Sequence, residues 1–124
     1  MRIYIASFFD TRTRLLPIRD QLQVMGHIVT SRWLSEGSDT AFENMTEAEL
    51  RGIALRDTND IEGSDLLILD TFDMSSRGGR EWGAGYAMGR GKPVWQVGPL
   101  RNVFHQIPSH FDNWQGIFTT LEKL

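Results

Sequence analysis

The segment Asp65-Leu66-Leu67-Ile68-Leu69-Asp70 decides the fold class of this chain. It places four consecutive apolar residues between two aspartates, a pattern that is typical of a strand covered on both faces. Strands buried in this way belong to parallel sheets, because the crossovers between parallel strands place helices on both faces. The segment therefore predicts an α/β protein in which residues 65–70 form a buried strand.

Strand and helix patterns alternate on both sides of this segment. We expect further strands over residues 2–7, 27–31 and 92–97, and a short strand before the last helix. The expected helices carry the apolar stripe Leu15, Ile18, Leu22 and Met25, span residues 46–62 and 81–90, and run from a cap at Asp112 or Asn113 to Leu121. This order predicts a parallel sheet of about five strands, with helices on both faces, in a single domain over residues 1–124.

Local patterns set several boundaries. Pro17 lies inside the apolar stripe of the first helix, and we expect it in the first turn, so that this helix starts near Leu16. Thr46 and Glu49 have the spacing of a capping box, which predicts the start of the second helix. Residues 33–44 are polar and include a glycine, and we expect a long loop there.

The bulk composition is that of an ordinary globular protein. The 124 residues are 40% hydrophobic and 23% charged, the net charge is −3, and there is no cysteine. The chain therefore has no disulfide framework and no thiolate zinc site, and its three histidines lack metal-ligand spacing. No apolar run approaches the roughly 18 residues of a membrane span, and no block of Lys or Arg suggests duplex nucleic acid. We expect a cytoplasmic protein with a small-molecule partner and no membrane partner.

Ligands of parallel sheets bind beyond the carboxyl ends of the strands. Three predicted loops meet at that edge, over residues 7–11, 70–80 and 98–105. In the second loop, Ser75-Ser76-Arg77-Gly78-Gly79-Arg80 combines hydroxyls, glycines and arginines just before a helix, which suits a phosphate or a sugar hydroxyl. The alternative is a flexible connection with solvated arginines.

Other residues near this edge have two interpretations each. Phe8 and Phe9 suit a sandwich around a flat base, although core packing explains at least one of them equally well. Gly83, Gly85 and Gly89 have the spacing GxGxxxG inside a helix, which excludes a dinucleotide fingerprint and favours close packing of the helix on the sheet. The carboxylates near the edge, for which a surface or capping role is the alternative, are Asp57, Asp60, Asp70, Asp73 and Glu81.

Several short motifs follow one another in the order of a known family. They are Ile3-Tyr4-Ile5-Ala6-Ser7-Phe8-Phe9, Asp57 eight residues before Asp65, the Ser/Gly loop, Gly85-Tyr86-Ala87 with Gly91-Lys92-Pro93-Val94, and Val97-Gly98 with Asn102-Val103-Phe104-His105. In these motifs the chain resembles the nucleoside 2-deoxyribosyltransferase-like superfamily, which includes nucleoside transferases and 2'-deoxynucleoside 5'-monophosphate N-glycosidases. The resemblance covers nearly the whole chain.

The resemblance implies a flavodoxin-like (Rossmann-like) three-layer fold and cleavage of the N-glycosidic bond of a 2'-deoxynucleoside. A glutamate after the glycine loop, here Glu81, attacks the anomeric carbon to form a covalent deoxyribosyl-enzyme. An aspartate that matches Asp57 holds the sugar or base and moves a proton. Water or a second base completes hydrolysis or transfer, without a metal or a cofactor. Members of the family are usually dimers or larger, so the resemblance also implies a homo-oligomer.

The position of the glutamate departs from the family pattern. Members of the family usually carry it two residues before the glycine of the Gly-Tyr-Ala segment, and that position is Gly83 here. Glu81 is two residues earlier, about 200° away on a regular helix. Either the helix begins later and Glu81 reaches the site from the loop, or this nucleophile is lost. In the second case the chain binds a nucleotide without cleaving it, or uses other carboxylates.

The 5'-substituent of the substrate also has two interpretations. Ser75 and Ser76 with Arg77 and Arg80 favour a 5'-monophosphate, whereas Asp73 would repel a phosphate dianion and suits a free 5'-hydroxyl. The expected substrate-binding residues are Ser7, Phe8, Phe9, Asp73, Ser75, Ser76, Arg77, Gly78, Gly79, Asn102 and His105.

Overall fold

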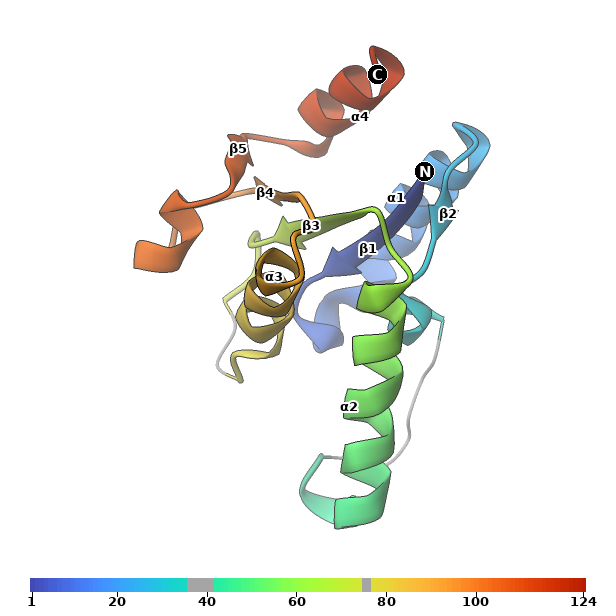
Figure 1. Cartoon of the computed structure of the whole chain (residues 1–124), viewed down its shortest axis with the longest axis vertical. Coiled ribbons are helices and arrows are strands. Elements are labelled where there is room, and N and C mark those ends of the chain that lie inside the picture. Colours follow the sequence, from blue (N-terminus) through green and yellow to red (C-terminus); the bar gives the residue numbers. More distant parts are fainter. Residues whose placement is uncertain (36–41, 75–76) are drawn as a thin grey trace.

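The computed structural model describes residues 1–35, 42–74 and 77–124, and in this part of the chain five parallel strands form one sheet in the order β2-β1-β3-β4-β5. This order is that of a flavodoxin-like fold, and it confirms the predicted α/β class (Figure 1). The strands are β1 (Arg2–Ala6), β2 (Ile28–Val29), β3 (Leu66–Asp70), β4 (Val94–Val97) and β5 (Ser109–Phe111). The helices are α1 (Arg12–Val24), α2 (Glu47–Glu62), α3 (Gly79–Gly89) and α4 (Trp114–Glu122).

The middle strand is β3, and all five of its residues are buried. It pairs with β1 on one side and with β4 on the other, so that Ile68 lies opposite Ile5 and Trp95. A strand with neighbours on both edges and helices on both faces has no water-facing side, which explains why its apolar run is unbroken.

Two successive residues of β3 show which helices cover which face of the sheet. The Asp70 carboxylate accepts hydrogen bonds from Arg14 of α1 and from Trp114 of α4. Leu69 points to the opposite face, where it lines a cavity together with Ala84 of α3. Because α2 packs against α3, the fold has three layers, with α1 and α4 on one face and α2 and α3 on the other.

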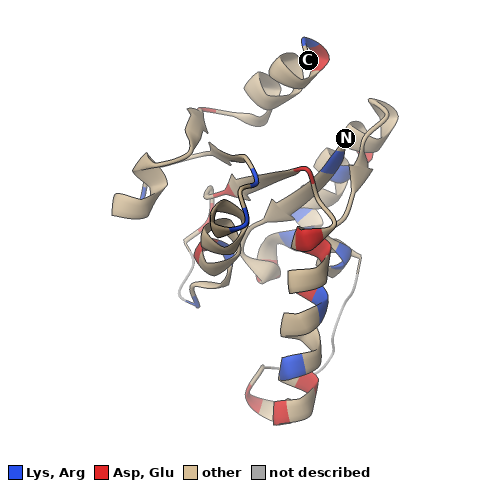
Figure 2. Ribbon diagram, viewed as in Figure 1, with Lys and Arg blue, Asp and Glu red and all other residues tan. Residues whose placement is uncertain are grey.

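The predicted capping box starts α2. Thr46 Oγ1 accepts the backbone N–H of Glu49 at 3.1 Å, and Glu49 Oε1 accepts that of Thr46 at 3.3 Å. Acidic and basic side chains are interspersed along the helix (Figure 2), as in a helix with one solvated face. Among the described helices, none combines the length and the apolar character that crossing a membrane requires.

Three boundaries differ from the sequence prediction. Helix α1 begins at Arg12, so the exposed Pro17 lies inside it and removes only the hydrogen bond to the Thr13 carbonyl. Strand β2 has two residues instead of five, because Ser31 beyond it bonds to β1 through its side chain: Ser31 Oγ accepts the N–H of Ile5 at 3.1 Å. Helix α3 begins at 79, two residues before the predicted start.

The predicted loop over residues 33–44 is wrong at both of its described ends. Trp33 and Leu34 are buried in a short 3-10 helix, and the Trp33 indole N–H donates to the carbonyl of Ile5 at 2.8 Å. These two side chains close the core beside β1, which explains why a polar stretch begins with large apolar residues. Phe42–Asn44 form a second 3-10 helix, and residues 36–41 lie outside the described part.

Candidate active site

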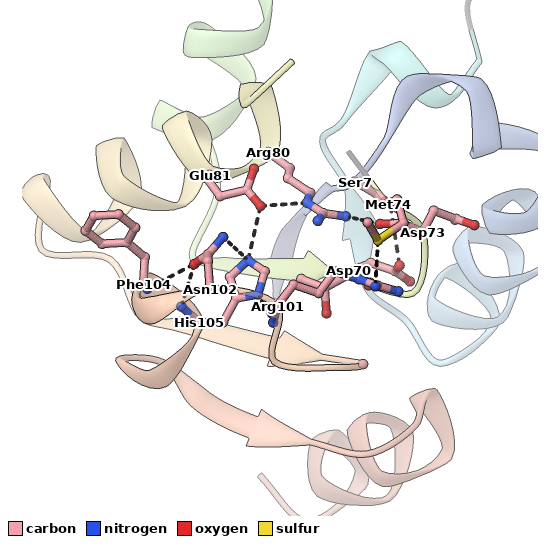
Figure 3. Close-up of polar contacts among 12 residues, drawn as sticks. Ser7, Asp70, Asp73, Met74, Arg80, Glu81, Arg101, Asn102, Phe104 and His105 are labelled. Carbon is pink, nitrogen blue, oxygen red and sulfur yellow. Dashed lines mark hydrogen bonds and ion pairs between the residues drawn. The ribbon is translucent and has the colours of Figure 1, made fainter. Parts of the chain in front are cut away.

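Glu81 lies in the first turn of α3, at the carboxyl edge of the sheet. The turn before it contains Gly78, whose φ of +76° is in the left-handed region that glycine adopts without strain. The Glu81 side chain is 23% exposed. Its Oε1 atom accepts hydrogen bonds from Arg80 Nε at 2.8 Å and from His105 Nε2 at 3.1 Å (Figure 3).

The pKa of Glu81 is set by opposing influences. Burial is the largest and raises the pKa, but hydrogen bonds from Arg80 and His105 and the positive charge of Arg80 lower it. The outcome is a pKa below the ordinary value of 4.5. The carboxylate is therefore ionised at neutral pH, as both a nucleophile and a stabiliser of positive charge must be.

His105 reaches Glu81 from the loop after β4. It is fully buried in the 3-10 helix Val103–Gln106, and its Nδ1 atom accepts the backbone N–H of Arg101 at 2.9 Å. Asn102 caps the same helix, because its Oδ1 atom accepts the backbone N–H groups of Phe104 and His105 at 2.9 and 3.2 Å. The imidazole is thus held by the backbone on the side away from Glu81.

Two cavities meet at Glu81 and Phe104, which line both. The first has a volume of about 330 Å³, and apolar atoms dominate its lining. Its walls include Leu69, Ala84, Met88 and Ile107. The second has a volume of about 450 Å³ and carries two guanidinium groups. Its walls include Met74, Arg80, Arg101 and Asn102. An ionised carboxylate therefore stands between an apolar space and a positively charged one.

Asp70 joins several elements at the end of β3. Its carboxylate accepts two hydrogen bonds from Arg14, at 2.8 and 3.2 Å, and one from Trp114 Nε1 at 2.7 Å. The backbone N–H of Phe72 and the hydroxyl of Ser7 also donate to it, at 3.2 and 3.4 Å. Because its side chain is fully buried, Asp70 fixes the start of the loop that leads to α3.

Solved structures share this fold. A 2-deoxyribosyltransferase from Bacillus psychrosaccharolyticus matches 98% of this chain over 96% of its own, with a TM-score of 0.77 and 22% sequence identity. The Clostridium botulinum CMP N-glycosidase BcmB matches over 100% of both chains, with a TM-score of 0.62 and 15% identity. The fold is that of a 2-deoxyribosyltransferase. No protein-family model matches the chain, and no curated protein matches its sequence significantly.

Of the two alternatives that the sequence suggested for Glu81, the later helix start is wrong, and the loss of the nucleophile stays untested. Helix α3 begins earlier than predicted, not later, and the Glu81 carboxylate still lies at the cavities. Gly83 occupies the position at which the family pattern has its glutamate. An added Cβ there would lie 3.4 Å from Ile61 Cδ1 of α2. This distance is an ordinary van der Waals contact with α2, so the close packing on the sheet that was predicted for Gly83 is not seen. Gly85 and Gly89 have open space, so the packing role predicted for them is wrong.

Asp57 stays apart from this cluster. Its carboxylate is paired with Arg56 on α2 at 3.2 Å, and it is absent from the described lining of both cavities. Burial is the largest influence on its pKa and raises it, while the charge of Arg56 opposes the shift. Asp60, the neighbouring carboxylate, is bonded to Arg32 at 2.9 Å.

The other predicted binding residues are dispersed around the carboxyl edge. Asp73 is paired with Arg14 at 2.8 Å, and Asn102 and Gly78 line the polar cavity, while Gly79 opens α3. Arg77 lies outside the cavity lining: its guanidinium is 4.8 Å from the ring centroid of Phe42 and 3.4 Å from Glu43. Ser75 and Ser76 lie outside the described residues.

The two phenylalanines after β1 lie away from the cavities. Phe9 is 40% exposed and packs against Trp33, with a centroid distance of 6.2 Å, beneath the guanidinium of Arg12. The carbonyl of Phe8 accepts the Thr11 hydroxyl at 2.7 Å, which fixes the turn into α1. Neither side chain is found in the described lining of the two cavities.

Arg101 is the polar residue of this site that sequence reasoning missed. Its guanidinium donates to the carbonyls of Thr71 and Phe72, both at 2.7 Å, and approaches the Met74 sulfur at 2.9 Å. It therefore ties the loop after β3 to the loop after β4. Its place within the predicted loop 98–105 was the only hint in the sequence. In the described part of the chain, no group of three His, Asp or Glu residues is arranged to hold a metal.

Proposed function

We propose that this chain belongs to the nucleoside 2-deoxyribosyltransferase-like superfamily and cleaves the N-glycosidic bond of a 2'-deoxynucleoside, with a 5'-monophosphate as the favoured substrate. The observation that carries the proposal is the ionised Glu81 carboxylate between an apolar cavity and a cavity with two arginines. The likeness in fold to a 2-deoxyribosyltransferase and to a CMP N-glycosidase supports it.

In this proposal each part of the substrate has a chemically matched space. A flat, largely apolar base suits the 330 Å³ cavity, and an anionic phosphate suits the cavity beside Arg80 and Arg101. The sugar then lies between them, with its anomeric carbon at Glu81. Asp73 is compatible with a phosphate because its carboxylate is neutralised by Arg14, which reduces the repulsion that its charge would otherwise cause.

The proposed reaction has two displacements. A carboxylate oxygen of Glu81 forms a bond to the anomeric carbon, and the carbon–nitrogen bond breaks with its electron pair leaving on the base, which takes up a proton. Water then attacks the same carbon, loses a proton and releases the carboxylate, or a second base takes the place of water. The resemblance to the superfamily makes Asp57 the proposed proton carrier, and burial raises its pKa, although Asp57 lines neither of the two described cavities.

We further propose that the chain works as a homo-oligomer. Trp82, Phe104 and Ile107 are 59%, 64% and 66% exposed, and all three line the apolar cavity. A second copy over these side chains would remove them from water and close the cavity. Light scattering on the purified protein should give a mass at least twice 14.2 kDa, and a monomeric mass would contradict this proposal.

The test is base release from the four deoxynucleoside monophosphates and the four deoxynucleosides, followed by chromatography. Glu81→Gln keeps the size of the side chain but removes the nucleophile, and should lower the rate at least about a thousandfold. The control is Glu122→Gln, an exposed glutamate at the end of α4, which should react like the wild type. Release that survives Glu81→Gln would refute the role of Glu81. Nucleotide binding without release, even with a second base as acceptor, would favour the alternative of a binding module.

A further inference from the structure

The hydrogen bonds of the Glu81 carboxylate are concentrated on one oxygen. Arg80 Nε and His105 Nε2 both approach Oε1, whereas Oε2 makes no hydrogen bond to another residue in the described part of the chain (Figure 3). Apart from the backbone N–H of Glu81 itself, which also lowers the pKa of this carboxylate, no described donor faces Oε2. The arrangement leaves Oε2 as the oxygen available to a substrate.

The surroundings of His105 select one tautomer of its ring. The backbone N–H of Arg101 can only donate, so Nδ1 must accept, and the proton of the neutral ring is on Nε2. This Nε2–H then donates to Glu81 Oε1 at 3.1 Å. The opposite tautomer would face the Arg101 N–H with a second hydrogen and the carboxylate with a lone pair. That tautomer would gain only a hydrogen bond from the Asn102 amide to Nε2. At 3.3 Å, this contact is the longest of the three that the ring nitrogens make.

The position of the ring is as well defined as its tautomer. His105 has no exposed side-chain surface, and Asn102 fixes the short helix that carries it by accepting two backbone N–H groups. Arg101, whose N–H sets the tautomer, is itself held by the carbonyls of Thr71 and Phe72. A preorganised donor of this kind costs no rearrangement when the carboxylate reacts.

We propose that His105 is a positioning residue for the nucleophile: its Nε2–H, together with Arg80, anchors Oε1 of Glu81 and directs Oε2 to the anomeric carbon. This inference rests on the proposed function. His105 also lines the apolar cavity, so the direct ligand contact that the sequence suggested for it stays a prediction. The distinction matters because a positioning residue affects the reactivity of Glu81 and leaves substrate affinity nearly unchanged.

The proposal has a consequence for the titration of Glu81. The charged and titratable groups that face this carboxylate are Arg80 on its own helix and His105 from the loop after β4, with Arg101 on the wall of the same cavity. The His105 hydrogen bond is one of the influences that lower the pKa of Glu81. Removing the donor should therefore raise this pKa and move the acidic limb of the rate profile to higher pH.

Two variants of His105 separate positioning from packing. His105→Leu removes the donor and fills the buried site with an apolar side chain. His105→Gln instead provides an N–H near the position of Nε2. Carboxyl ¹³C titration of substrate-free protein, with Glu81 assigned through Glu81→Gln, should show a raised pKa in the leucine variant and a nearly normal one in the glutamine variant. In the wild type, ¹⁵N shifts of the imidazole should show a protonated Nε2 and an unprotonated Nδ1.

Activity supplies the second readout. The leucine variant should lose kcat on the order of ten- to a hundredfold with little change in KM, and the glutamine variant should recover most of it. An unchanged Glu81 titration in His105→Leu, a proton on Nδ1 in the wild type, or a raised KM at normal kcat would overturn the proposal. If His105→Leu does not fold, the ¹⁵N shifts of the wild-type imidazole and the Glu81 titration in His105→Gln still test the proposal. Because the titrations need no substrate, failure of the proposed function would be recognised separately, as absence of base release by the wild type.

Discussion

Replacing Asp70 by Asn tests how much the buried carboxylate at the end of β3 contributes to stability. The wild-type side chain is fully buried and faces only donors: Arg14 twice, the Trp114 indole, the Phe72 amide and the Ser7 hydroxyl. An asparagine keeps one accepting oxygen, and its NH₂ group points two hydrogens at groups that are themselves donors. The substitution also removes the negative charge beside the guanidinium.

The expected loss follows from these contacts. Removing one partner of a buried ion pair costs about 3–5 kcal/mol, because the other partner is left without compensation. Arg14 is 36% exposed and keeps Asp73 as a second partner at 2.8 Å, which places the expected loss near the lower limit of about 3 kcal/mol. For a domain of 124 residues this corresponds to a fall in Tm of roughly 12 °C.

The assay is chemical and thermal unfolding of Asp70→Asn beside a matched control. Asp20→Asn makes the same change in a carboxylate that is 61% exposed and bonded to Arg19, and it should cost less than about 1 kcal/mol. Equal losses in the two variants would refute the reasoning, because the two carboxylates differ in burial and in the number of hydrogen bonds that they accept. A large loss in Asp70→Asn alone would support it.

Two further predictions concern a glycine and a buried acid. Gly98→Ala should destabilise the fold more than Gly26→Ala, which thermal unfolding can compare: both residues have positive φ, but only at Gly98 would a Cβ lie 2.9 Å from Thr71 Oγ1. Burial raises the pKa of Asp57 above 3.8, so the folded chain holds this proton more tightly than the unfolded chain and loses stability as the pH rises through the interval above 3.8. Asp57→Asn removes this loss. In urea unfolding over that pH range, the free energy of unfolding of the variant should therefore rise relative to that of the wild type as the pH rises. A difference in this free energy that does not change with pH would contradict the raised pKa of Asp57.

The class and order of the fold were predictable because the decisive patterns are local. A run of four apolar residues between Asp65 and Asp70 requires burial on both faces, and the capping box at Thr46 and Glu49 fixes a helix start by direct hydrogen bonds. Both features act within a few residues and were found as predicted. Alternation of strands and helices then leaves a parallel sheet as the simplest arrangement.

The boundaries that failed depend on contacts between distant segments. Trp33 is buried because its indole reaches the carbonyl of Ile5, a partner 28 positions earlier in the chain. Strand β2 is short because Ser31 replaces backbone pairing by a side-chain bond to the same residue. Pro17 is tolerated inside α1 because the carbonyl that it leaves unpaired lies at an exposed position. None of these compensations can be detected from the periodicity of the segment in which it occurs.

The site was predictable in location and only partly in detail. The rule that ligands bind beyond the carboxyl ends of parallel strands identified the loop over residues 98–105, which carries Arg101 and His105, and the loop over residues 70–80, which leads to Glu81 in α3. Sequence spacing could not show that His105 and Glu81 touch, because 24 residues separate them. The resemblance to the superfamily implied that Asp57 acts together with Glu81, whereas the described ion-pair partner of Asp57 is Arg56. The role of Asp57 in the reaction stays a prediction.

Asp70, which is buried, and Glu81, which is partly exposed, differ in the feature that decides the chemistry of a carboxylate. Asp70 has no exposed side-chain surface and five hydrogen-bond donors, so its lone pairs are occupied and its position is fixed on the α1 and α4 face. Glu81 is 23% exposed, and its donors gather on one oxygen. A carboxylate saturated with donors stabilises the loop but is a poor nucleophile, since attack would cost it those bonds. A carboxylate with one anchored and one free oxygen is oriented without losing its reactivity. This difference in accepted hydrogen bonds, and not the distance to a cavity alone, is why we assign the chemistry to Glu81.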